Sequence, residues 1–316
     1  MSTDEFPAKI LLFGEYIILL RPQALVIPFP HFQGILKLPE ISSANIDKSI
    51  EFSNQILDSY SKYIRRTLKI SSLSQRFDLK KFSCDIENGL YFESTIPLNF
   101  GLGSSGALTA AVYNQYIIPK DNPLGFRRVL ELEKWKKDLA LLESFFHSRS
   151  SGIDPLVSYI NLPLVVSDRG IEQLNFSLDK NGPLSAFLID TKTVRNTGNL
   201  VNQFLNDCKD PQYNELIMNE FQNLNDICIN SLINNEIATF FPALLELSKF
   251  EFQIFSKMIP DSVKPLWKSG LQSGMFGLKL CGSGGGGYML GFTLNYNVLK
   301  ENKYKTNLPI LHVDFL

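Results

Sequence analysis

Short runs of apolar residues along this 316-residue chain predict six strands. Residues 10–13 and 16–20 form two such runs on either side of Gly14 and Glu15, so we expect two strands joined by a turn. Four more runs predict a strand at residues 90–94, 164–166, 186–189 and 288–292.

Helical spacing of apolar residues dominates the remaining segments. Residues 52–68 are expected to form one helix, whose apolar face carries Phe52, Ile56, Leu57, Tyr60 and Ile64. Residues 125–146 predict one long helix or two. Residues 199–258 predict a mostly helical segment with interruptions near Pro211 and Pro242. The chain is therefore a mixture of α and β structure.

A glycine-rich loop stands between the predicted strand at 90–94 and an apolar run at 108–113. Residues 98–108 read Leu-Asn-Phe-Gly-Leu-Gly-Ser-Ser-Gly-Ala-Leu. The glycines allow a tight turn and a close approach of a ligand to the backbone. Since the following run predicts the start of a helix, its free N–H groups would bind an anion, most simply a phosphate. Ser104 and Ser105 add hydroxyls that can reach a phosphate oxygen or Mg²⁺.

Other glycine-loop families fit this segment less well. The spacing of Gly101, Gly103 and Gly106 matches the dinucleotide-binding pattern, but no suitable acid for a ribose follows about twenty residues later. The P-loop lysine is missing, as are the Val-Ala-Ile-Lys and Asp-Phe-Gly motifs of protein kinases. A loop that only turns the chain is the remaining alternative.

Composition narrows the class of protein. The 31 basic and 32 acidic residues nearly balance, so the sequence does not predict binding to nucleic acid or to a membrane surface. The four cysteines show no metal-binding spacing, which suits free thiols in a reducing compartment. Asp4 and Glu5 do not resemble the start of a signal peptide, and no apolar stretch is long enough to span a bilayer. We therefore expect a cytoplasmic protein.

Three further segments, together with the glycine loop, resemble a known set of motifs. They are Lys-Ile-Leu-Leu-Phe-Gly-Glu at 9–15, Glu143 followed by Ser-Gly-Ile-Asp at 151–154, and Lys-Leu-Cys-Gly-Ser-Gly-Gly-Gly-Gly at 279–287. In order and spacing they resemble the motifs of the GHMP small-molecule kinases. The resemblance is strongest to the mevalonate kinases of that family, and it includes Asp-Thr-Lys-Thr-Val-Arg-Asn-Thr at 190–197.

This resemblance implies an α+β fold with two domains. The N-terminal domain would be of the ribosomal-protein S5 domain 2-like type and the C-terminal domain ferredoxin-like, with ATP and substrate in the cleft between them. A turn cluster at 179–183 marks the expected boundary. Residues 1–182 would then carry the phosphate loop and the catalytic Asp, and residues 183–316 would form the second domain.

The residues themselves indicate how a phosphoryl group would be transferred. Asp154 is the candidate to orient or deprotonate an alcohol, and Lys9 would keep it ionised and stabilise developing charge. Glu143 and Ser105 supply oxygen ligands for Mg²⁺. The resemblance implies the same roles, and ATP phosphates would contact Gly101, Leu102, Gly103, Ser104, Ser105 and Gly106. Taken singly, each of these residues also has a structural explanation without catalysis, such as a helix cap for Asp154. For His147, four residues after Glu143, a role in packing or hydrogen bonding is favoured over metal binding.

Substrate contacts are expected from five residues: Glu15, Tyr16, Arg149, Arg195 and Thr197. Mevalonate kinases usually carry His where this chain has Tyr16, and Gly-Glu-Tyr is closer to phosphomevalonate kinases. Compared with the usual His-Gly-x-Pro-Ser-Gly motif, Ser148 and Ser150 replace the glycine and the proline, and Arg149 is gained at the variable position.

The favoured function is ATP-dependent phosphorylation of the primary hydroxyl of mevalonate in isoprenoid precursor synthesis. The alternatives within this class are a phosphomevalonate, homoserine or sugar kinase. An alternative of a different class is a non-catalytic sensor that binds a nucleotide or another small ligand. The expected partners are ATP and a small-molecule alcohol. The formation of a homodimer is left as an alternative to a monomer.

Overall fold

A computed structural model of the chain describes residues 4–20, 23–39, 48–69, 71–119, 129–147, 150–175, 182–194, 198–300 and 307–313. Contacts between Cα atoms divide the chain into two compact units. The first comprises residues Met1–Lys9, Ile27–Pro97 and Leu102–Leu162, and the second Ile10–Val26, Leu98–Gly101 and Pro163–Leu316. Strands β1 (Phe6–Phe13) and β2 (Ala24–Lys37) contribute residues to both units.

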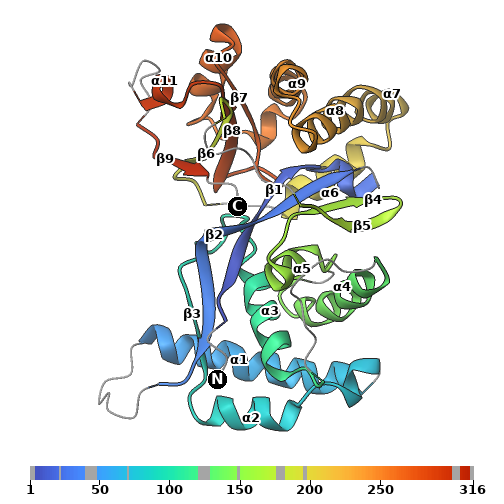
Figure 1. Cartoon of the computed structure of the whole chain (residues 1–316), viewed down its shortest axis with the longest axis vertical. Coiled ribbons are helices and arrows are strands. Elements are labelled where there is room, and N and C mark those ends of the chain that lie inside the picture. The colour runs from blue at the N-terminus through green and yellow to red at the C-terminus, as the bar shows by residue number, and fades with distance from the viewer. Residues whose placement is uncertain are drawn as a thin grey trace. The chain divides into compact units, whose positions relative to one another are not determined.

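In the first unit, β2 pairs antiparallel with β3 (Tyr91–Ser94), from Gly34 opposite Ser94 to Lys37 opposite Tyr91. The helices are α1 (Lys48–Leu68), α2 (Leu79–Glu87), α3 (Ser104–Tyr116), α4 (Val129–Glu143) and α5 (Ile153–Ile160). Helix α3 is apolar on nearly every side and is almost entirely buried, as expected of a helix surrounded by other elements. It packs along α5, as Figure 1 shows.

The second unit contains a hairpin and an antiparallel sheet. The hairpin joins β4 (Leu164–Ser167) to β5 (Gly170–Gln173) and pairs with β2 through Val26 opposite Leu164. The sheet has the order β7-β8-β6-β9, formed by β7 (Phe276–Leu280), β8 (Tyr288–Thr293), β6 (Ser185–Asp190) and β9 (Ile310–Val313). Every described residue of β7 and β8 is buried.

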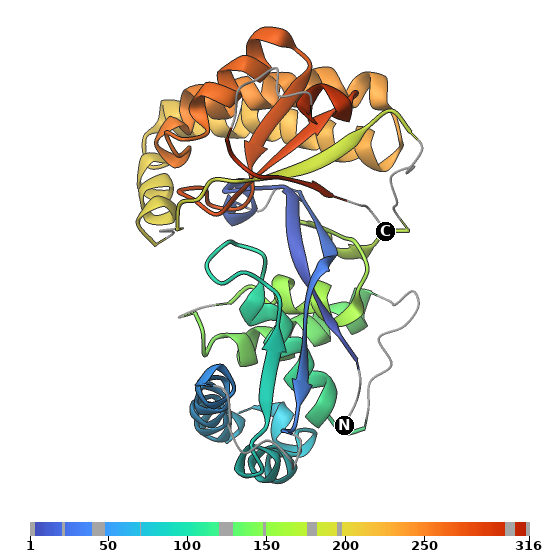
Figure 2. The same cartoon turned by 90° about the vertical axis from the view of Figure 1, so that its left-hand side faces the viewer.

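Helices lie along one face of this sheet (Figure 2), and α9 (Ile237–Ile254) and α10 (Lys264–Ser273) pack against β7. A Cβ at Gly277 of β7 would lie 3.0 Å from Leu244 of α9, and one at Gly270 of α10 would lie 2.6 Å from the Phe276 ring. The unit also contains α6 (Gly198–Asp207), α7 (Pro211–Leu216), α8 (Gln222–Ile233) and α11 (Tyr296–Lys300). Helices α7 and α8 are joined by a π-helical turn at Ile217–Phe221.

Two expectations from the apolar pattern are wrong. Residues 17–20 form a 3₁₀ turn rather than a strand, because Tyr16 has φ +63° and the amides of Ile17 and Ile18 bond back to Glu15 and Gly14. A short apolar run without alternation does not distinguish the two structures. Pro242 does not interrupt α9: it lies inside the helix, where its missing N–H removes one backbone hydrogen bond, and the helix continues to Ile254.

The other predicted strands form, as do helices at 48–68 and 129–143. Phe52, however, is exposed rather than on the buried face of α1. The compact units also group residues 163–182 with the second unit, whereas the turn cluster predicts a boundary after residue 182. The units are defined by contacts alone, so the functional domains 1–182 and 183–316 stay a prediction.

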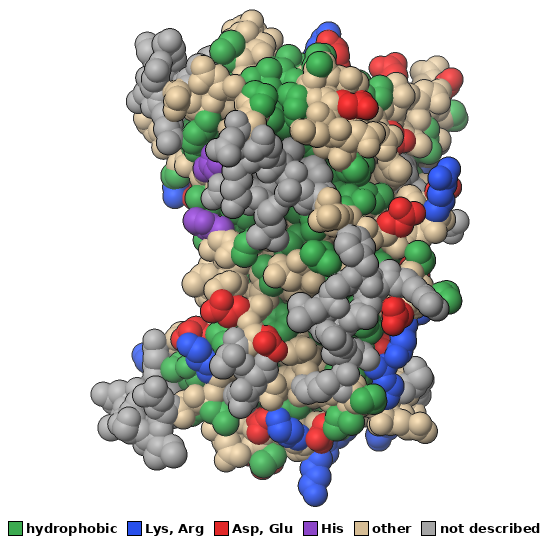
Figure 3. Space-filling model, in the orientation of Figure 1, with side chains coloured by type: hydrophobic (Ala, Val, Ile, Leu, Met, Phe, Trp, Pro, Cys, Tyr) green, Lys and Arg blue, Asp and Glu red, His purple; other side chains and the backbone are tan. Residues whose placement is uncertain are grey.

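Acidic and basic side chains are interspersed on the face of the molecule in Figure 3. This agrees with the near-zero net charge of the sequence. Of the helices in the described part of the chain, none combines the length and apolar character needed to cross a membrane.

Candidate active site

The part of the glycine loop that belongs to the first unit begins at Leu102 and leads into the N-terminus of α3. Gly103 has φ +74° and occupies the N-cap of α3, where no side chain of the described residues accepts a hydrogen bond from the helix amides. The first N–H groups of a helix have no partner within the helix. The loop is fixed to β1, because the Lys9 amide donates to the Leu102 carbonyl at 2.9 Å. The start of α3 therefore has amides without a side-chain cap among the described residues, and an anion site there stays a prediction.

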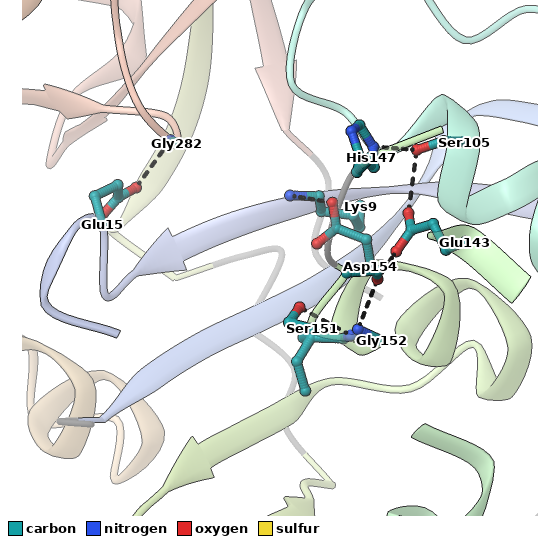
Figure 4. A network of polar contacts seen from close by, with 11 residues as sticks. Lys9, Glu15, Ser105, Glu143, His147, Ser151, Gly152, Asp154 and Gly282 are labelled. Carbon is teal, nitrogen blue, oxygen red and sulfur yellow. Dashed lines mark hydrogen bonds and ion pairs between the residues drawn. The ribbon is translucent and has the colours of Figure 1, made fainter. Parts of the chain in front are cut away.

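Lys9 and Asp154 meet beside this helix start. Their side chains form an ion pair of 2.9 Å, in which the Lys9 side chain is 11% exposed and that of Asp154 36%. Figure 4 shows Lys9 on β1 pointing toward Asp154, which comes from the first turn of α5. The structure therefore brings together two residues that are 145 positions apart in the sequence and were both predicted to be catalytic.

Glycines permit this close arrangement. A Cβ at Gly103 would lie 2.8 Å from Lys9 Cγ, and one at Gly106 would lie 2.9 Å from the Asp154 carbonyl carbon. Gly152, with φ +76°, caps α5, and a Cβ there would lie 2.2 Å from the Lys136 carbonyl oxygen. A side chain at any of these three positions would displace the backbone or the side chains around Asp154.

Glu143 and Ser105 are paired at the same site. Glu143 ends α4 and is 3% exposed, and its Oε1 accepts the Ser105 hydroxyl at 3.1 Å. Burial, and secondly the charge of Asp154, raise the pKa of Glu143 to about 7, against the opposing effects of Ser150, Ser105 and Lys9. This site thus concentrates negative charge that is only partly compensated.

These two oxygens fit a magnesium ion. Adjacent corners of a Mg²⁺ octahedron are about 2.9 Å apart, since Mg–O distances are about 2.0–2.1 Å. The observed separation of 3.1 Å is close to this value, and a divalent cation would offset the charges of Glu143 and Asp154. Among the described residues no group of three or more His, Cys, Asp or Glu side chains could hold a metal. A cation here would therefore need ligands from water or substrate, as Mg²⁺ commonly does.

Glu15, predicted to contact substrate, belongs to the second unit and has internal partners. It is 2% exposed, and its carboxylate forms an ion pair of 2.5 Å with Lys279. Its Oε1 also lies 3.4 Å from the Gly282 amide (Figure 4). A second buried acid, Glu251, accepts the Leu280 amide at 2.6 Å. The cluster Glu15, Lys279 and Glu251 therefore holds the start of the glycine turn at 281–287.

Tyr16 is likewise directed into the second unit. Its hydroxyl donates to the Ser283 carbonyl oxygen, and its ring packs against Phe204 and Phe255. It is 4% exposed. In the described structure Tyr16 therefore supports the glycine turn, and a role of Glu15 or Tyr16 in substrate binding stays a prediction.

The segment at 190–194 also packs on this turn. The Thr191 hydroxyl donates to the Gly287 carbonyl at 2.8 Å, and the Gly287 amide donates to the Thr193 carbonyl at 2.8 Å. On its other side, a Cβ at Gly287 would lie 2.9 Å from the Phe100 carbonyl oxygen. Phe100 belongs to the same unit as Gly287, so the second glycine turn lies against residues 98–101 of the first glycine loop.

The buried acid Glu251 leads to a prediction about stability and pH. Burial, opposed by the charge of Lys279, raises its pKa from 4.5 to about 8. The folded state then binds more protons than the unfolded state between these values, so stability decreases as pH rises through this window. Glu251→Gln should flatten this part of the pH dependence of Tm, where 1 kcal/mol corresponds to about 2–4 °C. An unchanged profile would contradict the assignment.

Sequence reasoning missed three residues that the structure brings into these clusters. Ser150 contacts Glu143, while Lys279 and Glu251 form the buried cluster with Glu15. Lys279 precedes the second glycine turn, but a single lysine in an apolar strand carries no signal for its partner. Arg149, Arg195 and Thr197, predicted to contact substrate, lie outside the described residues.

Solved structures show the same fold. The chain is similar to L. major mevalonate kinase in complex with R-mevalonate, with a TM-score of 0.68 and 15% identity over 99% of this chain and 97% of that one. It is similar to Streptococcus pneumoniae phosphomevalonate kinase in complex with phosphomevalonate and AMPPNP, with a TM-score of 0.60 and 14% identity over 100% of both chains. For Lactococcus lactis galactokinase complexed with galactose, the TM-score is 0.61 and the identity 13%, over 98% and 92%.

These similarities confirm the predicted α+β fold of the GHMP kinases over the whole chain. At such low identity they concern the fold and not the substrate. By sequence, no protein-family profile and no curated protein matches the chain.

Proposed function

We propose that this protein is an ATP-dependent kinase of a small-molecule alcohol, with mevalonate as the favoured acceptor. The observation that carries the proposal is the ion pair of Lys9 and Asp154, 2.9 Å long, beside the uncapped start of α3. A transferred phosphoryl group requires anion binding, charge neutralisation and an aligned hydroxyl, with little covalent chemistry by the protein. The described residues offer a group for each of these tasks.

Asp154 would act on the acceptor alcohol. Its carboxylate accepts the hydroxyl proton as the oxygen attacks the γ-phosphorus of ATP, and the bond from that phosphorus to the bridging oxygen of ADP breaks. The Lys9 ammonium, paired with Asp154 at 2.9 Å, would stabilise charge on the transferred group. The amides at the start of α3 and the loop residues 101–106 would hold the ATP phosphates.

Ser105 and Glu143 would hold Mg²⁺, which neutralises phosphate charge when it is bound. Ser105→Ala and Glu143→Gln should each raise the Mg²⁺ concentration needed for half-maximal activity, because each removes one oxygen ligand from an ion with few protein ligands. Metal titrations of turnover measure this midpoint. Ser104→Ala, in the same turn, tests whether the neighbouring hydroxyl holds the ion instead of Ser105. If neither variant shifts the midpoint, the metal is held elsewhere.

Two acceptors, mevalonate and phosphomevalonate, are the leading candidates. Structures with the same fold include proteins crystallised with mevalonate, phosphomevalonate and galactose. The Gly-Glu-Tyr sequence at 14–16 resembles that of phosphomevalonate kinases. Tyr16 therefore makes phosphomevalonate the second candidate acceptor. Counter-charge for a mevalonate carboxylate would come from Arg149, Arg195 or Lys9, and an arginine suits a carboxylate or a phosphate equally well.

A coupled assay of ADP release tests the proposal with mevalonate, phosphomevalonate, homoserine and galactose as acceptors. Mevalonate should give the highest kcat/KM. Arg149→Ala and Arg195→Ala distinguish the two leading acceptors. If Arg149→Ala lowers kcat/KM for phosphomevalonate far more than for mevalonate, phosphomevalonate becomes the favoured acceptor. Transfer to none of the four, together with retained nucleotide binding, would favour a ligand-binding sensor instead.

A further inference from the structure

One hydroxyl, that of Ser150, links Glu143 to the start of α5, the helix that carries Asp154. Its Oγ donates to Glu143 Oε2 and accepts the Gly152 amide at 2.9 Å. Gly152 caps α5, and Asp154 follows two residues later in the first turn of that helix. The end of α4 and the start of α5 are therefore joined through a side chain that no role in the proposed reaction requires.

His147 occupies the opposite end of the same hydrogen-bonded chain. Its Nε2 lies 3.1 Å from Ser105 Oγ, whose hydrogen is directed to Glu143 Oε1 at 3.1 Å. A hydroxyl has one hydrogen and two lone pairs, so in the tautomer that carries a hydrogen on Nε2 the ring donates to one lone pair and the other stays available. In that tautomer the contact between His147 and Ser105, drawn in Figure 4, holds the Ser105 hydroxyl in one rotation.

We propose that Ser150 and His147 are positioning residues, which hold the Glu143 carboxylate and the Ser105 hydroxyl in place for a magnesium ion. The inference rests on the proposed function, because it concerns the site assigned there to Mg²⁺. Ser150 fixes the carboxylate from Oε2, and His147 fixes the hydroxyl, so the spacing of 3.1 Å between the two ligand atoms is set from both sides. Partners of this kind typically change metal affinity about 10–100-fold.

The sequence pattern agrees with a specific role for Ser150. It stands where the His-Gly-x-Pro-Ser-Gly motif of similar kinases has proline, and proline has no hydroxyl to donate. The adjacent serine, Ser151, has a different partner, since its hydroxyl accepts the Ile153 amide at 3.3 Å. The two neighbouring serines therefore form a matched pair, in which only Ser150 contacts Glu143.

Calorimetric titration with the ATP analogue AMPPNP tests the proposal, in excess Mg²⁺ and again in EDTA. The ratio of the two affinities measures how strongly the metal supports nucleotide binding. Ser150→Ala and His147→Leu should each lower this ratio about tenfold and leave the affinity in EDTA within twofold of wild type. Ser150→Thr and His147→Gln retain a hydrogen-bonding atom near the original position and should restore most of the ratio. Ser151→Ala should leave it unchanged.

Several results would overturn the inference. A wild-type ratio in both Ser150→Ala and His147→Leu would show that the hydrogen bonds do not position the ligands. Equal losses of affinity in Mg²⁺ and EDTA would indicate a general structural role, as would failure of Ser150→Thr and His147→Gln to rescue. Failure of the wild-type protein to bind AMPPNP in either condition would instead remove the proposed function, and the inference with it. Since His147 and Ser150 are tested separately, misfolding of one variant leaves the other decisive.

Discussion

Asp154→Asn is expected to lower phosphoryl transfer at least ~10²-fold while nucleotide binding stays near normal. The asparagine amide preserves size and shape but cannot accept the proton of the acceptor alcohol. It also removes the partner of Lys9, whose ammonium lies 2.9 Å from the carboxylate. Steady-state turnover with the best acceptor, measured beside AMPPNP affinity, separates lost chemistry from lost binding.

The matched comparison for this variant is Asp58→Asn. Asp58 also pairs with a lysine, Lys62, but on the exposed side of α1, where an ion pair contributes at most about 1 kcal/mol. Its turnover should equal that of wild type. An Asp154→Asn protein with wild-type turnover would show that another group takes the proton, and the assignment of Asp154 would be wrong.

Lys279→Met is expected to destabilise the protein by about 3–5 kcal/mol, which corresponds to a fall in Tm of at least about 6 °C. Lys279 is fully buried and forms an ion pair of 2.5 Å with Glu15, which is also buried. Burial raises the pKa values of both Glu15 and Glu251. The pKa of Glu251 is about 8 even with the ammonium present. Without the ammonium, Glu15 would also lose its compensating charge in the described cluster, and it would have to take up a proton or stay buried as an uncompensated charge.

Thermal and denaturant unfolding measure this loss of stability. Two further variants show whether it comes from the buried charge. Lys264→Met removes the lysine of an exposed pair with Asp261 and should cost less than about 1 kcal/mol. The double variant Glu15→Gln with Lys279→Met removes both charges, so it should be more stable than Lys279→Met alone. A loss below 1 kcal/mol for Lys279→Met would mean that water or another group solvates Glu15.

Local patterns in the sequence are sufficient to predict most helices and strands of this protein. The run at 10–13, the apolar spacing at 52–68 and the runs at 186–189 and 288–292 each predict the element that forms, because strand and helix place side chains at different periods. The order and spacing of four motifs similarly predict the GHMP-kinase fold, which the solved structures confirm. The motifs alone also predict four site residues that the structure brings together in pairs: Lys9 with Asp154, and Ser105 with Glu143.

Residue pairing, by contrast, depends on contacts between distant parts of the chain. The sequence contains no signal that Glu15 pairs with Lys279, 264 positions later, or that Ser150 donates to Glu143 rather than facing solvent. Tyr16 resembled a substrate contact by its place in a motif, yet its ring packs against Phe204 and Phe255.

The sequence by itself thus determined most of the elements, the fold and the residue types of the glycine loop. Only the tertiary structure decided which charges are buried, which acid carries a raised pKa and which side chains hold the loop and the second glycine turn. The reason is physical: backbone periodicity and glycine conformation act within a few residues along the chain. Desolvation and ion pairing depend instead on which distant side chains packing brings within hydrogen-bonding distance.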